Sequence, residues 1–121
     1  MSTPRSESLK IEILGGAKGS RILKLTGPLT LQTLFDFQQI ARQDATKPIV
    51  VDLTNTSYMD SAGLGAILSV FASCQRTQRG FAVTGRSERI RTLFEVTHVD
   101  GVIPCFDSLD AAESAVVKHV A

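Results

Sequence analysis

Residues 58–68, with the sequence YMDSAGLGAIL, combine an acid, a hydroxyl and two glycines where an apolar segment ends and helical spacing begins. The Ser61 hydroxyl, next to the carboxylate of Asp60, could act as a nucleophile, cap a helix or accept a phosphate. Gly63 and Gly65 leave the backbone uncovered, so another surface can approach it closely. The question is which of these chemistries the spacing supports.

Two catalytic interpretations match this stretch only in part. A nucleophile elbow requires G-x-S-x-G, but the pentapeptide centred on Ser61 is MDSAG, and the only histidines that could serve as its base are His98 and His119. A dinucleotide fingerprint requires G-x-G-x-x-G, but Leu68 occupies the place of the third glycine. GGAKGS, residues 15–20, contains glycine, lysine and serine, but not in the order of a phosphate-binding loop.

Two further interpretations need no catalysis. In the structural one, Ser61 is the N-cap of a helix, which Asp60 supports, and such a cap stabilises by about 1 kcal/mol. In the regulatory one, a kinase phosphorylates Ser61 and adds about −1.5 to −2 charges at pH 7. The positive end of the helix dipole would tolerate that charge. The phosphate would nevertheless repel a partner that docks on this surface, while the domain stayed folded.

The residues around this stretch predict an α/β domain that would place it after a central strand. Alternating residues predict a hairpin of strands 9–14 and 21–27, and short apolar runs predict strands 48–54, 80–85 and 101–106. Helical spacing predicts helices over 28–44, from Gly63 to about Gly80, over 87–98 and over 108–120. The order ββαβαβαβα predicts a single domain with a mixed, mostly parallel sheet and about four helices.

The caps and inward faces of these helices follow from the same pattern. Thr30, Ser87 and Ser108 are the expected N-caps. The side chains expected to face the core are Leu31, Leu34, Phe37, Gln38 and Ala41 in the first helix, Leu64, Ile67, Leu68, Phe71 and Cys74 in the second, and Ile90, Leu93 and Phe94 in the third.

Composition restricts the function classes. The chain has 121 residues, of which 43% are hydrophobic, and we expect a flexible tail over 1–8 and one folded domain over 9–121. The 13 basic and 12 acidic residues are balanced, which argues against direct nucleic-acid binding. No apolar run approaches the roughly 20 residues of a membrane span, and no signal peptide is evident, so a cytoplasmic location is expected. Cys74 and Cys105 are expected to be reduced and buried.

Residues 49–68, IVVDLTNTSYMDSAGLGAIL, resemble the signature of STAS domains, the family of bacterial anti-sigma factor antagonists. That signature is an apolar strand ending in D-L, a short loop, then D-S-x-G-L-G and a helix. The similarity continues through residues 80–116, GFAVTGRSERIRTLFEVTHVDGVIPCFDSLDAAESAV, and covers about Leu9 to Val120.

The resemblance implies a regulatory role without catalysis or a cofactor. Ser61 matches the phosphoacceptor of such antagonists. The unphosphorylated protein would bind an anti-sigma factor that is itself a serine kinase, and so free a sigma factor. The kinase would use ATP to phosphorylate the serine, and a PP2C-type phosphatase would reverse this. The expected partner-binding residues are Asp60, Ser61, Ala62, Gly63 and Gly65, together with Pro28 and Thr30 in the loop after the second strand.

The sequence departs from the family pattern at two places. Many antagonists carry an acidic G-E-L-D-like turn where this chain has GPLT, Gly27–Thr30, and many have serine or threonine where this chain has Ala62. These departures leave a constitutive STAS scaffold or a transporter-associated binding module, without phosphorylation, as the alternative. A nucleotide-binding domain is the third interpretation.

Overall fold

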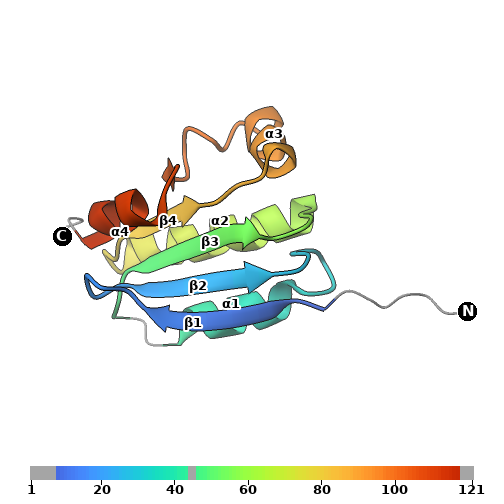
Figure 1. Cartoon of the computed structure of the whole chain (residues 1–121). Coiled ribbons are helices and arrows are strands. Elements are labelled where there is room, and N and C mark those ends of the chain that lie inside the picture. Colours follow the sequence, from blue (N-terminus) through green and yellow to red (C-terminus); the bar gives the residue numbers. More distant parts are fainter. Residues whose placement is uncertain (1–7, 44–45, 118–121) are drawn as a thin grey trace, which may run out of the picture.

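The computed structural model describes residues 8–43 and 46–117, in which four helices pack on one five-stranded sheet (Figure 1). The elements are β1 (Lys10–Gly15), β2 (Arg21–Thr26), α1 (Leu34–Arg42), β3 (Ile49–Asn55), α2 (Ser61–Arg76), β4 (Phe81–Thr84), α3 (Glu88–Val96), β5 (Cys105–Phe106) and α4 (Leu109–Val117). The predicted order is confirmed. Most of the expected tail, residues 1–7, and the end of the expected last helix lie outside the described residues.

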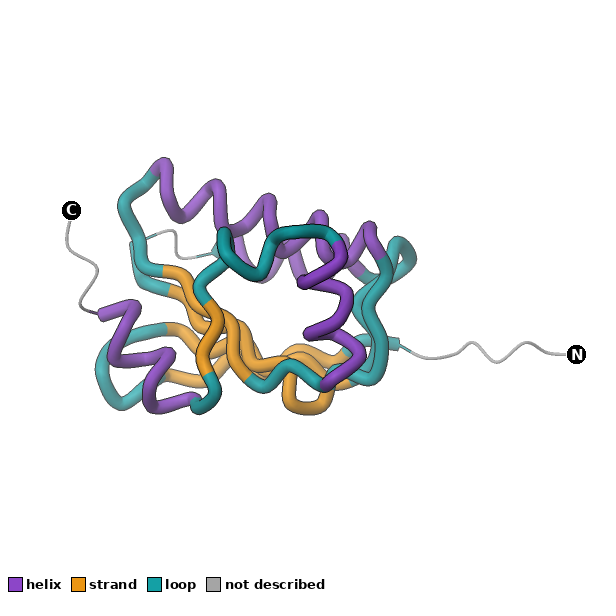
Figure 2. Tube along the Cα trace, turned by 90° about the horizontal axis from the view of Figure 1, so that it is seen from above, coloured by secondary structure: helices purple, strands orange, loops and turns teal. Residues whose placement is uncertain are grey.

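The strands lie in the sheet in the order in which they occur along the chain, from β1 to β5. β1 pairs with β2 as an antiparallel hairpin, and the pairs β2–β3, β3–β4 and β4–β5 are parallel. Each parallel pair is joined through a helix, and right-handed connections of this kind place successive helices on the same face of the sheet. Figure 2 shows the long α2 on one side of the sheet and α4 on the other.

Two apolar clusters hold these layers together. The larger one joins α1, α2 and α3 to one face of the sheet, through residues that include Leu34, Phe37, Leu64, Ile67, Cys74, Ile90 and Phe94. The smaller one joins α4 to the other face through Ile22, Val50, Ala82, Ala112 and Val116. β3 is therefore covered on both sides, which explains its almost continuous apolar sequence. Of the residues expected to face inward, Gln38, Leu68, Phe71 and Leu93 are only partly buried.

The start of α1 differs from the prediction. Its N-cap is Thr33 rather than Thr30, and the side chain of Leu31 is 63% exposed instead of facing the core. The hydroxyl of Thr33 accepts a hydrogen bond from the Thr30 amide and donates one to the Pro28 carbonyl, at 2.9 Å each. These bonds hold residues 28–33 in a turn, which delays the helix by one turn.

The bounds of α2 also differ from the prediction. The helix begins at Ser61, two residues before Gly63, and it ends at Arg76 rather than near Gly80. The helix ends early because the backbone of Gln78, with a φ of 58°, adopts the left-handed conformation that terminates a helix. By contrast, the expected caps Ser87 and Ser108 are confirmed, since each hydroxyl accepts a hydrogen bond from the amide three residues later.

Candidate functional site

Two loops lie side by side at the edge of the sheet where β2 and β3 end. Residues 27–33 follow β2 and residues 56–60 follow β3, and both leave the sheet on the side where α2 begins (Figure 1). Backbone hydrogen bonds join Leu29 N to Tyr58 O at 2.9 Å and Asp60 N to Leu29 O at 3.4 Å. The first loop therefore lies directly against the start of α2, as expected for a shared surface.

Asp60 is the N-cap of α2. Its Oδ1 accepts a hydrogen bond from Gly63 N at 2.8 Å, and its Oδ2 accepts one from Leu31 N at 3.2 Å. The structural interpretation in which Ser61 caps the helix is therefore wrong. One carboxylate therefore accepts a hydrogen bond from a backbone amide in the first turn of α2 and another from the neighbouring loop, and so connects the two segments.

Ser61 is the first residue of α2 and is exposed. In the described part of the chain, its hydroxyl makes no hydrogen bond, either to Asp60 or to a histidine that could serve as a base. Of the two histidines that a hydrolase could have used as a base, His98 lies in an exposed turn after α3 and His119 lies outside the described residues. The arrangement offers an accessible hydroxyl at the positive end of a helix, and no group among the described residues is bonded to it that would activate it as a nucleophile.

The two glycines of this stretch have different roles. A Cβ on Gly63 would collide with the carbonyl oxygen of Leu29, and the residue is buried, so this glycine allows α2 to pack against the first loop. A Cβ on Gly65 would meet nothing within 4 Å, and the residue is exposed. We expected both glycines to leave the backbone open to a partner. This expectation is wrong for Gly63, whose backbone is covered by the first loop, and it agrees with the exposed position of Gly65.

The remaining expected site residues are less accessible than the sequence suggested. Pro28 is buried and Thr30 is half-buried, so Pro28 cannot present its side chain to a partner. Ala62 is half-buried next to Ser61.

Three exposed apolar side chains on the two loops and the first turn of α1 were not expected from the sequence. Leu31, Phe35 and Tyr58 are 63%, 69% and 44% exposed, and they come from the first loop, the first turn of α1 and the second loop. The sequence carries a signal for Phe35, because this aromatic residue lies off the apolar stripe formed by Leu34, Phe37 and Ala41.

The described residues add no other chemical group to the site. They contain no cluster of His, Cys, Asp or Glu that could hold a metal ion, and none of their helices is long and apolar enough to cross a membrane. Both cysteines are free thiols, with Cys74 buried and Cys105 half-buried. Burial raises the pKa of each thiol, and a nearby arginine partly offsets this, Arg79 at Cys74 and Arg86 at Cys105.

A model of one protein family, described as the STAS domain, matches residues 8–112. The chain belongs to the STAS domain family. The matched range includes both loops, the hairpin and α2, so the resemblance seen in the sequence is confirmed over most of the chain. An anti-sigma-B factor antagonist of Staphylococcus aureus is 36% identical over 78 residues, which cover 62% of this STAS domain and 72% of that relative.

Solved structures share the fold. An anti-sigma factor antagonist from Mycobacterium paratuberculosis superposes with a TM-score of 0.81 at 22% identity, covering 97% of this chain and 99% of that one. The Bacillus protein SpoIIAA in its phosphorylated form superposes with a TM-score of 0.67 at 14% identity, covering 87% of this chain and 98% of that one. The murine anion transporter Slc26a9 superposes with a TM-score of 0.69 at 14% identity, but the superposition covers only 18% of that chain. The fold alone therefore does not separate regulators from transporters.

Proposed function

We propose that this STAS domain is an anti-sigma factor antagonist that acts by partner switching, with Ser61 as its phosphoacceptor. The unphosphorylated form binds an anti-sigma factor and so frees a sigma factor for transcription. The anti-sigma factor is itself a serine kinase that binds the ATP, and a PP2C-type phosphatase restores the serine. The domain acts in the cytoplasm as a binding module, with no cofactor and no direct contact with nucleic acid or membrane.

The observation that carries this proposal is the exposed hydroxyl of Ser61 at the first position of α2, which makes no hydrogen bond to any described residue. Because Asp60 caps the helix, a modified Ser61 leaves the cap in place. The positive end of the helix dipole also favours an added phosphate. Phosphorylation is therefore compatible with the folded state, as a reversible switch requires.

The charges around Ser61 explain why a phosphate would prevent docking. Neither loop, 27–33 or 56–60, contains a lysine or arginine that could pair with the phosphate, and Asp60 stands directly beside it. The added charge would therefore stay exposed to a partner. Exposed Leu31 and Tyr58, on the two loops beside the start of α2, are side chains of the kind that protein interfaces bury.

The first experiment measures the intact mass of the protein isolated from its own cells, with peptide mapping across residues 58–68. We expect a population that carries a single phosphate on Ser61, and its loss in Ser61→Ala. Ser57→Ala and Ser69→Ala are matched controls, because both hydroxyls are exposed and close to Ser61 in the chain.

The second experiment tests the switch itself. Wild-type, Ser61→Ala and Ser61→Asp proteins serve as bait in pull-downs from the same cells, and the captured anti-sigma factor is then titrated by calorimetry. We expect Ser61→Asp to bind at least tenfold more weakly, which is about 1.4 kcal/mol. Equal affinity of all three, together with an unphosphorylated wild-type protein, would instead favour a constitutive scaffold.

A further inference from the structure

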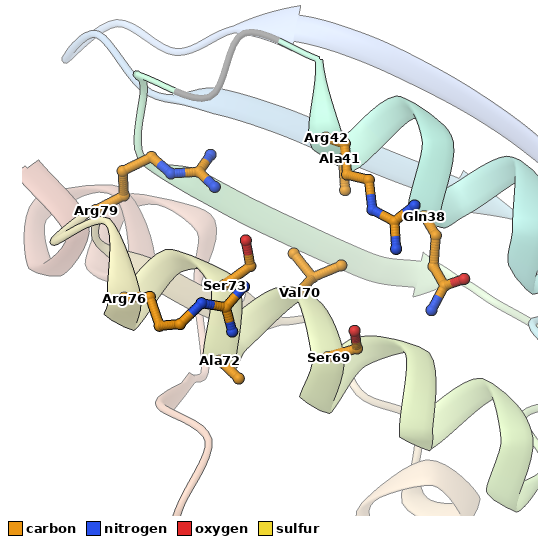
Figure 3. A pocket seen from close by; sticks show the side chains of 9 residues that line it. All are labelled: Gln38, Ala41, Arg42, Ser69, Val70, Ala72, Ser73, Arg76 and Arg79. Atoms are coloured by element: carbon orange, nitrogen blue, oxygen red, sulfur yellow. The ribbon is translucent and has the colours of Figure 1, made fainter.

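The end of α2 opposite Ser61 lies beside a cavity lined by arginines. The cavity measures about 150 Å³ and lies between α1 and α2 (Figure 3). Its lining contains Arg42, Arg76 and Arg79, with the polar side chains of Gln38, Ser69 and Ser73, and none of the described residues that line it is acidic. We name it the arginine cavity. Because α2 rises about 1.5 Å per residue, its last residue lies about 22 Å from Ser61, so the two sites are separate.

Arg79 is the buried member of this set. Only 7% of its surface is exposed, its Nε donates a hydrogen bond to Thr77 Oγ1 at 2.9 Å, and its Nη1 is buried without an acceptor in the described part of the chain. In Figure 3 its guanidinium group points into the space between α1 and α2. A buried cation without an acceptor is costly, and an anion in the cavity would compensate it.

Capping of the helix ends does not account for the three arginines. At the end of α1, the carbonyls of Ile40 and Gln43 accept hydrogen bonds from Arg21 instead of Arg42. At the end of α2, the carbonyl of Cys74 accepts from the Thr77 hydroxyl and from the backbone amide of Arg79, so no guanidinium is needed there.

The other two guanidinium groups of the cavity belong to Arg42 and Arg76. Within the described residues, the side chains of Arg42 and Arg76 make no hydrogen bond or ion pair. Three positive charges thus surround a small space that offers hydroxyl and amide groups as further hydrogen-bonding partners.

We propose that the arginine cavity binds a small phosphate-bearing anion, either inorganic phosphate or the phosphate group of a small monoester. Guanidinium groups bind phosphate through paired N–H donors, and two hydroxyls supplement them here. The size of the cavity excludes larger ligands, because pockets for drug-sized molecules measure roughly 300–1,000 Å³. The described residues that line it include no aromatic side chain on which a nucleotide base could stack.

The test is a titration of ¹⁵N-labelled full-length protein with inorganic phosphate, followed by amide chemical shifts at constant ionic strength set with sodium chloride. We expect saturable shifts that concentrate on residues 69–79 and on the last turn of α1. Glycerol phosphate, titrated in the same way, distinguishes a monoester site from one that accepts free phosphate alone. Either ligand saturating there supports the proposal, whereas only linear, scattered shifts for both would overturn it.

Variants separate this site from general charge effects. Arg79→Met and Arg42→Gln should each weaken phosphate binding at least fivefold. Arg89→Gln is the matched control, because Arg89 is an exposed arginine in the first turn of α3 that lies outside the lining of the cavity and makes no hydrogen bond or ion pair within the described residues. Arg42→Gln keeps the test decisive if Arg79→Met fails to fold, since Arg42 is exposed. Wild-type affinity in Arg42→Gln and in folded Arg79→Met would contradict the proposal, as would tighter binding of ATP than of phosphate.

Discussion

Asp60 Oδ2 accepts a hydrogen bond from the backbone nitrogen of Leu31, which lies 29 residues earlier in the chain, at 3.2 Å. The other oxygen of the same carboxylate caps α2 through Gly63 N. A single side chain therefore sets both the start of the helix that carries Ser61 and the position of the loop beside it.

Replacement of Asp60 tests this double role. Asp60→Ala should lower the free energy of unfolding by about 0.5–2 kcal/mol, because the cap of α2 is lost. Asp60→Asn should lower the free energy of unfolding by less, since the side-chain oxygen of asparagine can still accept a hydrogen bond from Gly63 N. Urea denaturation monitored by circular dichroism measures both variants. Equal stability of Asp60→Ala and wild type would show that the carboxylate does not support the helix.

The two glycines of α2 should respond in opposite directions to alanine. Gly63→Ala should destabilise by about 1–3 kcal/mol, because the new methyl group collides with the backbone of Leu29. Gly65→Ala should stabilise by about 0.5–1 kcal/mol, because its methyl group meets nothing and alanine favours a helix. Thermal unfolding compares the pair under identical conditions. A destabilised Gly65→Ala would mean that this glycine is needed for the fold.

Ser61 should be dispensable for stability. Its hydroxyl makes no hydrogen bond in the described part of the chain, so Ser61→Ala should change the free energy of unfolding by less than about 0.5 kcal/mol. Ser61→Asp places a negative charge at the helix start and should stabilise by about 0.3–1 kcal/mol at low salt. Denaturation at low and high sodium chloride checks this, because salt should reduce the gain. Unfolding of either variant would assign Ser61 a structural role.

The thiols should react slowly in the folded protein. Burial raises the pKa of Cys74 and of Cys105 above the ordinary value of 9.0, so both remain protonated at pH 8. Ellman's reagent should label them slowly in the native state and rapidly in guanidinium chloride. Fast native labelling of Cys74 would contradict its burial.

The same shift predicts a pH dependence of stability. A raised pKa means that the folded state favours the neutral thiol, so the stabilisation is complete below pH 9 and is lost as the pH rises through the native pKa. The free energy of unfolding should therefore decline as the pH rises above about 9. Cys74→Ala should show a shallower decline in urea denaturation, and an unchanged slope would exclude this thiol as a cause.

The sequence by itself determined the order of elements, the hairpin, the buried central strand and the strand-to-helix position of Ser61. These features depend on local periodicity and on residues such as Ser87 and Ser108, whose effect is confined to their own helix turn. The family signature depends on the same local residues, so it too could be recognised without coordinates.

Only the tertiary structure decided which residue caps α2, why Gly63 must be glycine and where Leu31 points. Each depends on contacts between the two loops, which the pairing of β2 with β3 brings together. The same holds for Arg42 and Arg79, which are 37 positions apart in the sequence and line one cavity only because α1 and α2 pack side by side. Periodicity reports which face of a helix is buried, but it carries no information on which distant segment that face or its ends will meet.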